Sequence, residues 1–127
     1  MPTHLTLLLA HGSRDSHWLA PFTSLLKQIN SALPAVQCTL AYLELAEPSL
    51  EQSIRAAIAQ GVYNIDIIPL FFASGRHLRH DVPVLLEKLQ QEAKLQGIAL
   101  NIHLSQPVGL EPEVAEAISK VIQRQLS

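Results

Sequence analysis

The sequence predicts an α/β fold in which a four-stranded parallel sheet lies between helices on both of its faces. Four apolar runs have the length of strands, and each is followed by a segment whose apolar residues recur at helical spacing. The connections between them are short. Because this alternation is typical of doubly wound sheets, we expect a flavodoxin-like three-layer sandwich with strand order 2-1-3-4. We expect residues 1–127 to form a single domain.

The four expected strands are nearly continuous apolar runs, as is typical of strands that are covered on both faces. The third contains Pro69, which cannot donate a hydrogen bond to a neighbouring strand, so this strand should end near it. The expected strands are residues 3–10, 36–43, 64–71 and 98–104.

The first and fourth helices are predicted from apolar stripes. The first spans about residues 16–33, and Trp18 is expected to pack against the rest of the molecule. The fourth begins near Glu111. Its apolar residues, which we expect to face inward, are Val114, Ala117, Ile118, Val121 and Ile122.

The second and third helices are predicted from residues that begin and end helices. Ser49 is a candidate N-cap for the second helix, and Gly61 a candidate for its end. Asp81 could cap the third helix, and Gly97 could end it.

Composition excludes several classes of protein. The formal net charge of −2 predicts no general affinity for nucleic acid or for anionic membranes. Cys38 is the single cysteine, which excludes an internal disulfide and a CxxC zinc site. No run approaches the ~18 apolar residues of a membrane span, and no signal peptide is visible. We therefore expect a cytoplasmic protein.

Two histidines follow apolar strands that the expected topology places side by side. His11 comes directly after the first strand, and His77 follows the third. Ligands of open α/β sheets bind outside the carboxyl ends of the strands, where the strand order reverses. Two imidazoles at this edge could bind a metal ion or move protons.

Other polar groups are predicted at the same edge. Gly12 and Ser13 begin a loop that leads into a helix and could hold an anion. Arg14 and Arg76 suit a ligand that carries carboxylates or phosphates. Glu44 follows the second strand and could accept protons or assist a metal ion, although it fits a plain surface carboxylate equally well.

These segments together resemble the class II chelatases of the sirohydrochlorin cobaltochelatase and ferrochelatase family (CbiX-like). The matching segments are Ala10-His11-Gly12-Ser13-Arg14, Tyr42-Leu43-Glu44-Leu45-Ala46-Glu47-Pro48-Ser49, Pro69-Leu70-Phe71-Phe72, Gly75-Arg76-His77 and Asp81-Val82-Pro83. The resemblance implies a chelatase-like fold and insertion of a divalent metal (Co²⁺, Fe²⁺ or Ni²⁺) into sirohydrochlorin, for siroheme- or cobalamin-type tetrapyrroles. The metal is a substrate, and no organic cofactor is implied.

The resemblance also implies roles for particular residues. His11 and His77 would bind the metal and handle protons, with Glu44 as a helper. The chain resembles the short, single-lobed form of the family, which assembles as a homodimer. Residues expected to contact the tetrapyrrole are Ser13, Arg14, Tyr42, Phe72, Ser74, Gly75 and Arg76.

Two other functions fit the same residues. A carrier of metal or tetrapyrrole without turnover would use the same side chains as a chelatase. A phosphate-ester hydrolase could use His11, but Ala10 stands where histidine phosphatases have an arginine.

Overall fold

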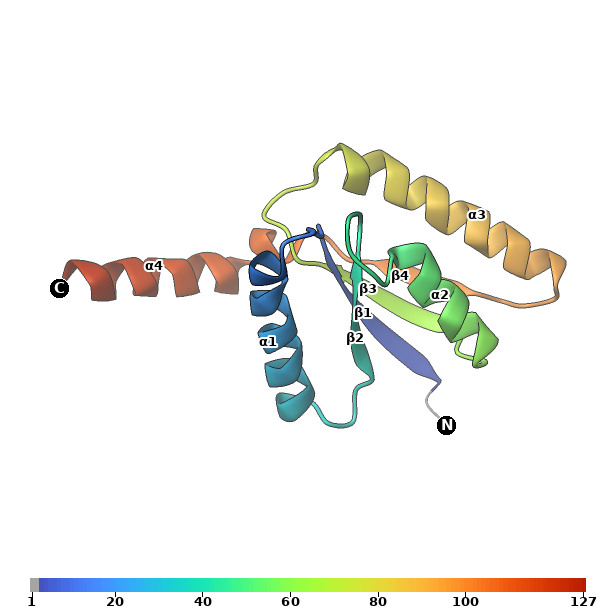
Figure 1. Ribbon diagram of the computed structural model, residues 1–127, viewed down its shortest axis with the longest axis horizontal. Helices are drawn as coiled ribbons and strands as arrows, with labels where there is room; N and C mark the ends of the chain where they lie inside the picture. Colours follow the sequence, from blue (N-terminus) through green and yellow to red (C-terminus); the bar gives the residue numbers. More distant parts are fainter. Residues whose placement is uncertain (1–2) are drawn as a thin grey trace.

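The computed structural model describes residues 3–127, and within this range four strands form one parallel sheet (Figure 1). The strand order is β2-β1-β3-β4, with helices on both faces, as the sequence predicts. The strand order reverses between β1 and β3, which are hydrogen-bonded neighbours. The strands are β1 (His4–Ala10), β2 (Cys38–Tyr42), β3 (Asn64–Pro69) and β4 (Asn101–Leu104).

The strands are shorter than their apolar runs. β3 ends at Pro69, as expected from the missing amide hydrogen of proline. The segments after β1 and β2 nevertheless stay paired, because the Leu43 amide donates to the Ala10 carbonyl at 3.0 Å. This pairing carries the two chain segments together to the carboxyl edge of the sheet.

One face of the sheet is covered by α2 (Leu50–Ala59) and α3 (Val82–Leu95). Leu7 and Ile67 of the central strands are fully buried beneath them, together with Ile54 and Leu89 of the helices. Burial of each of these side chains is worth about 1.5–3 kcal/mol. This face holds the larger of the two clusters of buried residues, and so the larger part of the core.

The two helices on this face begin in different ways. Ser49 caps α2 as predicted, and its side chain and that of Gln52 form reciprocal hydrogen bonds at 3.1 and 2.7 Å. The prediction that Asp81 caps α3 is wrong. Asp81 lies in helical conformation at the end of a π-helical turn (His77–Asp81), where its side chain cannot take the cap position.

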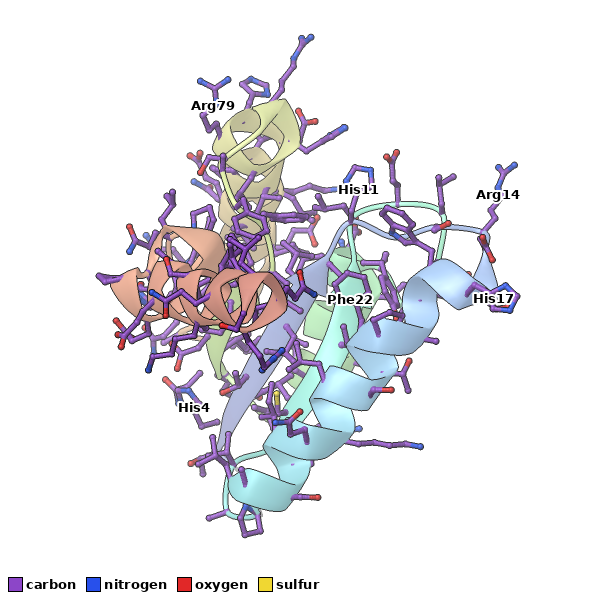
Figure 2. All side chains as sticks on the ribbon, turned by 90° about the vertical axis from the view of Figure 1, so that its left-hand side faces the viewer. His4, His11, Arg14, His17, Phe22 and Arg79 are labelled. Atoms are coloured by element: carbon purple, nitrogen blue, oxygen red, sulfur yellow. The ribbon has the colours of Figure 1, made fainter. Side chains whose placement is uncertain are left out.

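The opposite face is only half covered within residues 3–127. α1 (Ser16–Ala32) packs over β1 and β2, with Phe22 and Leu26 against the buried Cys38 and Leu40 (Figure 2). Trp18 was expected to pack as well, but its side chain is 60% exposed. Over β4, the side chain of His103 on this face is exposed to solvent.

The fourth helix, α4 (Pro112–Leu126), points away from the sheet (Figure 1). The prediction that its apolar residues face inward is wrong, because none of residues 112–126 is buried. Ile118 is 40% exposed and Ile122 is 50% exposed. No helix within the described range is long and apolar enough to cross a membrane.

Candidate functional site

His11 and His77 meet at the carboxyl edge of the sheet. His11 directly follows β1, and His77 begins the π-helical turn that follows β3. Their ring centroids are 6.4 Å apart, with the ring planes inclined by 67°. Each side chain is about half exposed, so both rings are open to a ligand. The structure thus brings together the two histidines that the sequence placed at neighbouring strand ends.

The His11 ring lies between an aromatic ring and a carboxylate. Phe71 packs edge-on against it, with centroids 6.5 Å apart. Its Nε2 atom lies 2.9 Å from Oε1 of Glu44, an ion pair when His11 is protonated. The Glu44 amide donates to the His11 carbonyl at 3.1 Å, which fixes the two loops side by side.

Gly12 permits this close approach of the two loops. Its φ is +103°, a conformation that residues with a Cβ rarely adopt. A Cβ at this position would lie 1.8 Å from the Glu44 carbonyl oxygen. Only glycine therefore allows His11 and Glu44 to lie next to each other with this backbone.

The His77 ring is held by Asp81, one helical turn further along the chain. The Nδ1 atom of His77 lies 2.8 Å from one carboxylate oxygen of Asp81, and Nδ1 of His80 lies 3.0 Å from the other. Hydrogen bonds from His80 and His77 hold the pKa of the Asp81 carboxyl below its usual value. A carboxylate on Nδ1 favours the tautomer whose Nε2 lone pair is free, and this is the nitrogen that can bind a metal.

Asp81 is the site residue that the sequence reading missed. We expected a helix cap, although the spacing of four residues between His77 and Asp81 was a usable signal. Side chains at this spacing lie on the same side of a helical turn.

The loop after β1 places its polar residues away from the two rings. The Ser13 hydroxyl accepts a hydrogen bond from the Asp15 amide at 3.0 Å, so it is engaged within the loop. The Asp15 side chain in turn caps α1. The Arg14 side chain points outward beside His17, on the far side of the loop from His11 (Figure 2).

The remaining predicted site residues differ in exposure. Tyr42 is 6% exposed and packs in the core on the α1 face, so it supports the site from beneath. Phe72 is 67% exposed, close to the Phe71 that contacts His11. Ser74, Gly75 and Arg76 lie in the segment between β3 and His77, where Ser74 is half-buried and the other two are exposed.

A groove runs from the His77 ring along the start of α2. It has a volume of about 300 Å³ and is bordered by His77, Asp81, Ser49 and Leu85. Within residues 3–127, no set of three or more His, Cys, Asp or Glu side chains converges into a complete metal cage. The site offers two imidazole rings, each of which has a carboxylate beside one of its nitrogens.

A parallel sheet with paired histidines at its switch point defines an α/β protein whose ligand site lies at the carboxyl edge of the strands. The family model described as CbiX matches residues 5–125, nearly the whole chain. The chain belongs to the CbiX family.

Individual relatives agree with this assignment. The chain is 24% identical over 121 residues to a sirohydrochlorin cobaltochelatase of Sulfolobus acidocaldarius, covering 95% of this chain and 91% of that protein. A CbiX protein of Marinobacter aquaeolei VT8 has a similar structure, with a TM-score of 0.82, 39% identity and 97% of each chain covered.

A longer relative is also similar. The sirohydrochlorin chelatase SirB of Bacillus subtilis subspecies spizizenii, solved in complex with cobalt, gives a TM-score of 0.76 at 25% identity. The match covers 97% of this chain but 51% of SirB, so this chain spans about half of that protein.

Proposed function

We propose that this chain is a metallochelatase that inserts a divalent metal, with cobalt as the first candidate, into sirohydrochlorin. The observation that carries the proposal is the pair of imidazoles 6.4 Å apart at the sheet switch point, each with a carboxylate at one nitrogen. The names of the relatives from Sulfolobus and Bacillus support the same reaction. Iron and nickel are the other candidate substrates, since imidazole suits all three ions.

In this proposal the metal substrate binds the nitrogen of each ring that does not face a carboxylate. This nitrogen is Nδ1 of His11 and Nε2 of His77. Two protein ligands leave the other coordination positions to water and then to the pyrrole nitrogens. A chelatase needs such partial ligation, because a closed four-ligand cage would retain the ion.

Insertion exchanges M²⁺ for the two N–H protons of the macrocycle, so the site must accept protons as the metal leaves it. Imidazole side chains commonly act as proton acceptors, so the two rings can take these protons. Glu44 lies 2.9 Å from His11 Nε2 and stabilises the imidazolium that forms when His11 takes a proton. Glu44 is thus assigned a proton-handling role next to the metal.

The macrocycle would lie over the exposed side of the histidine pair. The Phe72 ring offers an apolar surface beside it, and Arg76 can pair with peripheral carboxylates. Arg14 points away from His11, so it is not assigned to this surface. Ser74 and Gly75 border this surface, whereas Ser13 and the buried Tyr42 position the loops.

The groove beside His77 is at the lower limit of drug-sized sites, which run from about 300 to 1,000 Å³. A tetrapyrrole needs a larger cleft, so we include a homodimer in the proposal. We also propose that the chain acts as one cytoplasmic domain, with no nucleic-acid or membrane partner.

The test is an anaerobic absorbance time course of sirohydrochlorin with Co²⁺ and a catalytic amount of protein. We expect many turnovers for the wild type and none above the spontaneous rate for His77→Ala. His17→Ala is the matched control, because His17 is 98% exposed and points away from the site (Figure 2). It should keep wild-type activity.

Two results would contradict the proposal. An active His77→Ala variant would remove His77 from the reaction. A stoichiometric spectral change without turnover by the wild type would instead indicate a carrier. Repeating the time course with Fe²⁺ and Ni²⁺ would then rank the metal substrates.

A further inference from the structure

Leu45 has a backbone conformation that leucine rarely adopts. Its φ is +62°, and within residues 3–127 it is the one residue other than glycine whose φ is positive. In this left-handed region the Cβ atom lies too close to the following carbonyl oxygen, a clash that glycine does not have. A glycine at position 45 would therefore fit the backbone better, and the leucine side chain needs another explanation.

The loop after β2 is held at both ends, which forces this conformation. At its start, the Glu44 amide donates to the His11 carbonyl at 3.1 Å. At its end, the Pro48 carbonyl accepts a hydrogen bond from the Tyr42 amide at 3.0 Å, so the chain has turned back on itself. Leu45 lies between the two anchors, and its positive φ is part of this reversal.

Packing within the chain does not explain the leucine. Leu43 packs against the buried cluster under α2 and α3, and Ala46 packs against the cluster under α1. Leu45 lies between them and is 51% exposed. Residues in strained conformations are concentrated at active sites and ligand-binding sites. An exposed apolar side chain on a strained backbone therefore indicates a contact with a ligand.

The strand order places Leu45, His11 and Phe72 in a row along the carboxyl edge of the sheet. They follow β2, β1 and β3, which are neighbours in that order (Figure 1). Glu44, directly before Leu45, lies 2.9 Å from the His11 ring. Phe71, directly before Phe72, packs against the same ring. Neighbouring strands lie about 4.8 Å apart, so the two exposed apolar residues follow strands that are about 10 Å apart, with His11 between them.

We propose that Leu45 is a substrate-contact residue, which supports one face of the tetrapyrrole ring together with Phe72. The ring is flat and apolar, whereas its carboxylates lie at the rim. Two apolar side chains on either side of His11 match such a face and leave His11 under the middle of the ring. This inference rests on the proposed function and adds a residue to the surface described there.

The charges of the two loops favour the same orientation of the ring. Glu44 and Glu47, which lie one residue before and two residues after Leu45, are exposed. Their carboxylates repel the acidic rim of the tetrapyrrole, so the loop after β2 can accept the apolar face but not the rim. Arg76, which is exposed in the segment after β3, attracts the rim. The contact with Leu45 therefore selects a flat apolar ring over a small ligand that carries carboxylates.

The first experiment titrates the protein with metal-free sirohydrochlorin and follows the absorbance of the tetrapyrrole. Leu45→Gly and Leu45→Asn should each raise Kd about 10-fold, because both remove apolar surface from the contact. Glycine and asparagine both accept a positive φ, so the backbone of the loop can stay as it is. Leu45→Met keeps an apolar side chain and should bind like the wild type.

The second measurement compares unfolding by urea. Leu45→Gly should have the same midpoint as the wild type or a higher one, because glycine removes the clash at positive φ. Leu33→Gly is the matched control: Leu33 is 52% exposed, like Leu45, but it follows α1 at the opposite edge of the sheet. Its φ is −128°, so glycine gains nothing there, and the Kd for sirohydrochlorin should not change.

Isothermal titration with Co²⁺ separates a contact from a structural role. Because His11 and Glu44 keep their anchors, the Co²⁺ affinity of Leu45→Gly should equal that of the wild type. A parallel loss of Co²⁺ and tetrapyrrole affinity in Leu45→Gly and Leu45→Asn would overturn the contact, since Leu45 would then act by shaping the loop.

The outcomes also separate this inference from the proposed function. A wild type that neither binds nor metallates sirohydrochlorin would overturn both. Normal turnover by the wild type with an unchanged Kd in Leu45→Gly and Leu45→Asn would overturn the role of Leu45 alone. A fall in molecular mass in these variants, measured by light scattering, would place Leu45 in a contact between copies and overturn its role as well. Because two variants are compared, the result stands even if one of them fails to fold.

Discussion

Asp81 determines how the His77 ring is presented to a ligand. Its carboxylate accepts hydrogen bonds from both His77 and His80, and these bonds hold its pKa below the usual value. When a carboxylate accepts a hydrogen bond from the ring nitrogen that does not bind the metal, it fixes the tautomer of the histidine and makes the ring a better ligand. Asp81 is therefore a positioning residue for His77.

We expect Asp81→Asn to weaken Co²⁺ binding by about 10- to 100-fold, because a neutral amide holds the His77 tautomer less firmly. Isothermal titration with Co²⁺ alone measures this effect without tetrapyrrole. Asp66→Asn is the matched control: Asp66 also pairs with a histidine, His4, at 2.6 Å, but at the other end of the sheet. Equal losses of affinity in both variants would contradict the role of Asp81.

Gly12 shows how a single residue shapes the site. Alanine here would have to adopt a φ of +103° and would place its Cβ 1.8 Å from the Glu44 carbonyl oxygen. We expect Gly12→Ala to lower the free energy of unfolding by about 2–4 kcal/mol, measured by urea denaturation. Gly75→Ala is the control, because a Cβ at Gly75 meets no atom within 4 Å. Unchanged stability of Gly12→Ala would show that the loops separate easily.

Sequence reasoning found the histidine pair but not its support. His11 and His77 could be predicted to face each other because strand order alone brings the ends of β1 and β3 together. Asp81 was expected to cap a helix, since an acidic residue before a helix usually does so, and its spacing from His77 becomes informative only if residues 77–81 form a helical turn, here a rare π-helical one. Contacts within irregular turns depend on backbone geometry that residue type does not determine.

At the scale of elements, α1 shields β2 on a face that is otherwise thinly covered. Cys38 of β2 lies beneath it and is 6% exposed. Burial raises the pKa of the Cys38 thiol above its ordinary value of 9.0. The thiol group is therefore both covered and harder to ionise, and its reactivity reports how firmly α1 is packed.

We expect native Cys38 to react slowly with iodoacetamide up to pH 9 and much faster in urea, where α1 no longer covers it. The pKa of the Cys38 thiol is raised in the folded state. Its contribution to the free energy of unfolding is therefore present at lower pH and is lost as the pH rises through the folded pKa. The difference in unfolding free energy between wild type and Cys38→Ala should show this loss. Fast alkylation of the native protein near neutral pH would mean that α1 detaches readily.

The helices differ in how far the sequence predicts them. The Ser49 cap of α2 is local, and the structure has it as predicted. The apolar stripe of α4 is present at the predicted spacing but is exposed, because periodicity does not say what a stripe packs against. For this reason Ile118 and Trp18 were both expected to pack inward, and both are exposed in the structure.

At the scale of the whole molecule, the proposed homodimer would link folding to association. A copy that unfolds would also lose its contact with the partner. Such a dimer has no stability independent of protein concentration. Folding, dimer formation and closure of the histidine cleft would then be one equilibrium.

We expect the Tm of the wild type to rise by about 3 °C for each tenfold increase in concentration, given the unfolding enthalpy of a dimer of this size. Differential scanning fluorimetry over a hundredfold range of concentration measures the slope. A flat Tm for the wild type would mean that each copy folds alone, and the cleft would then have to form after folding.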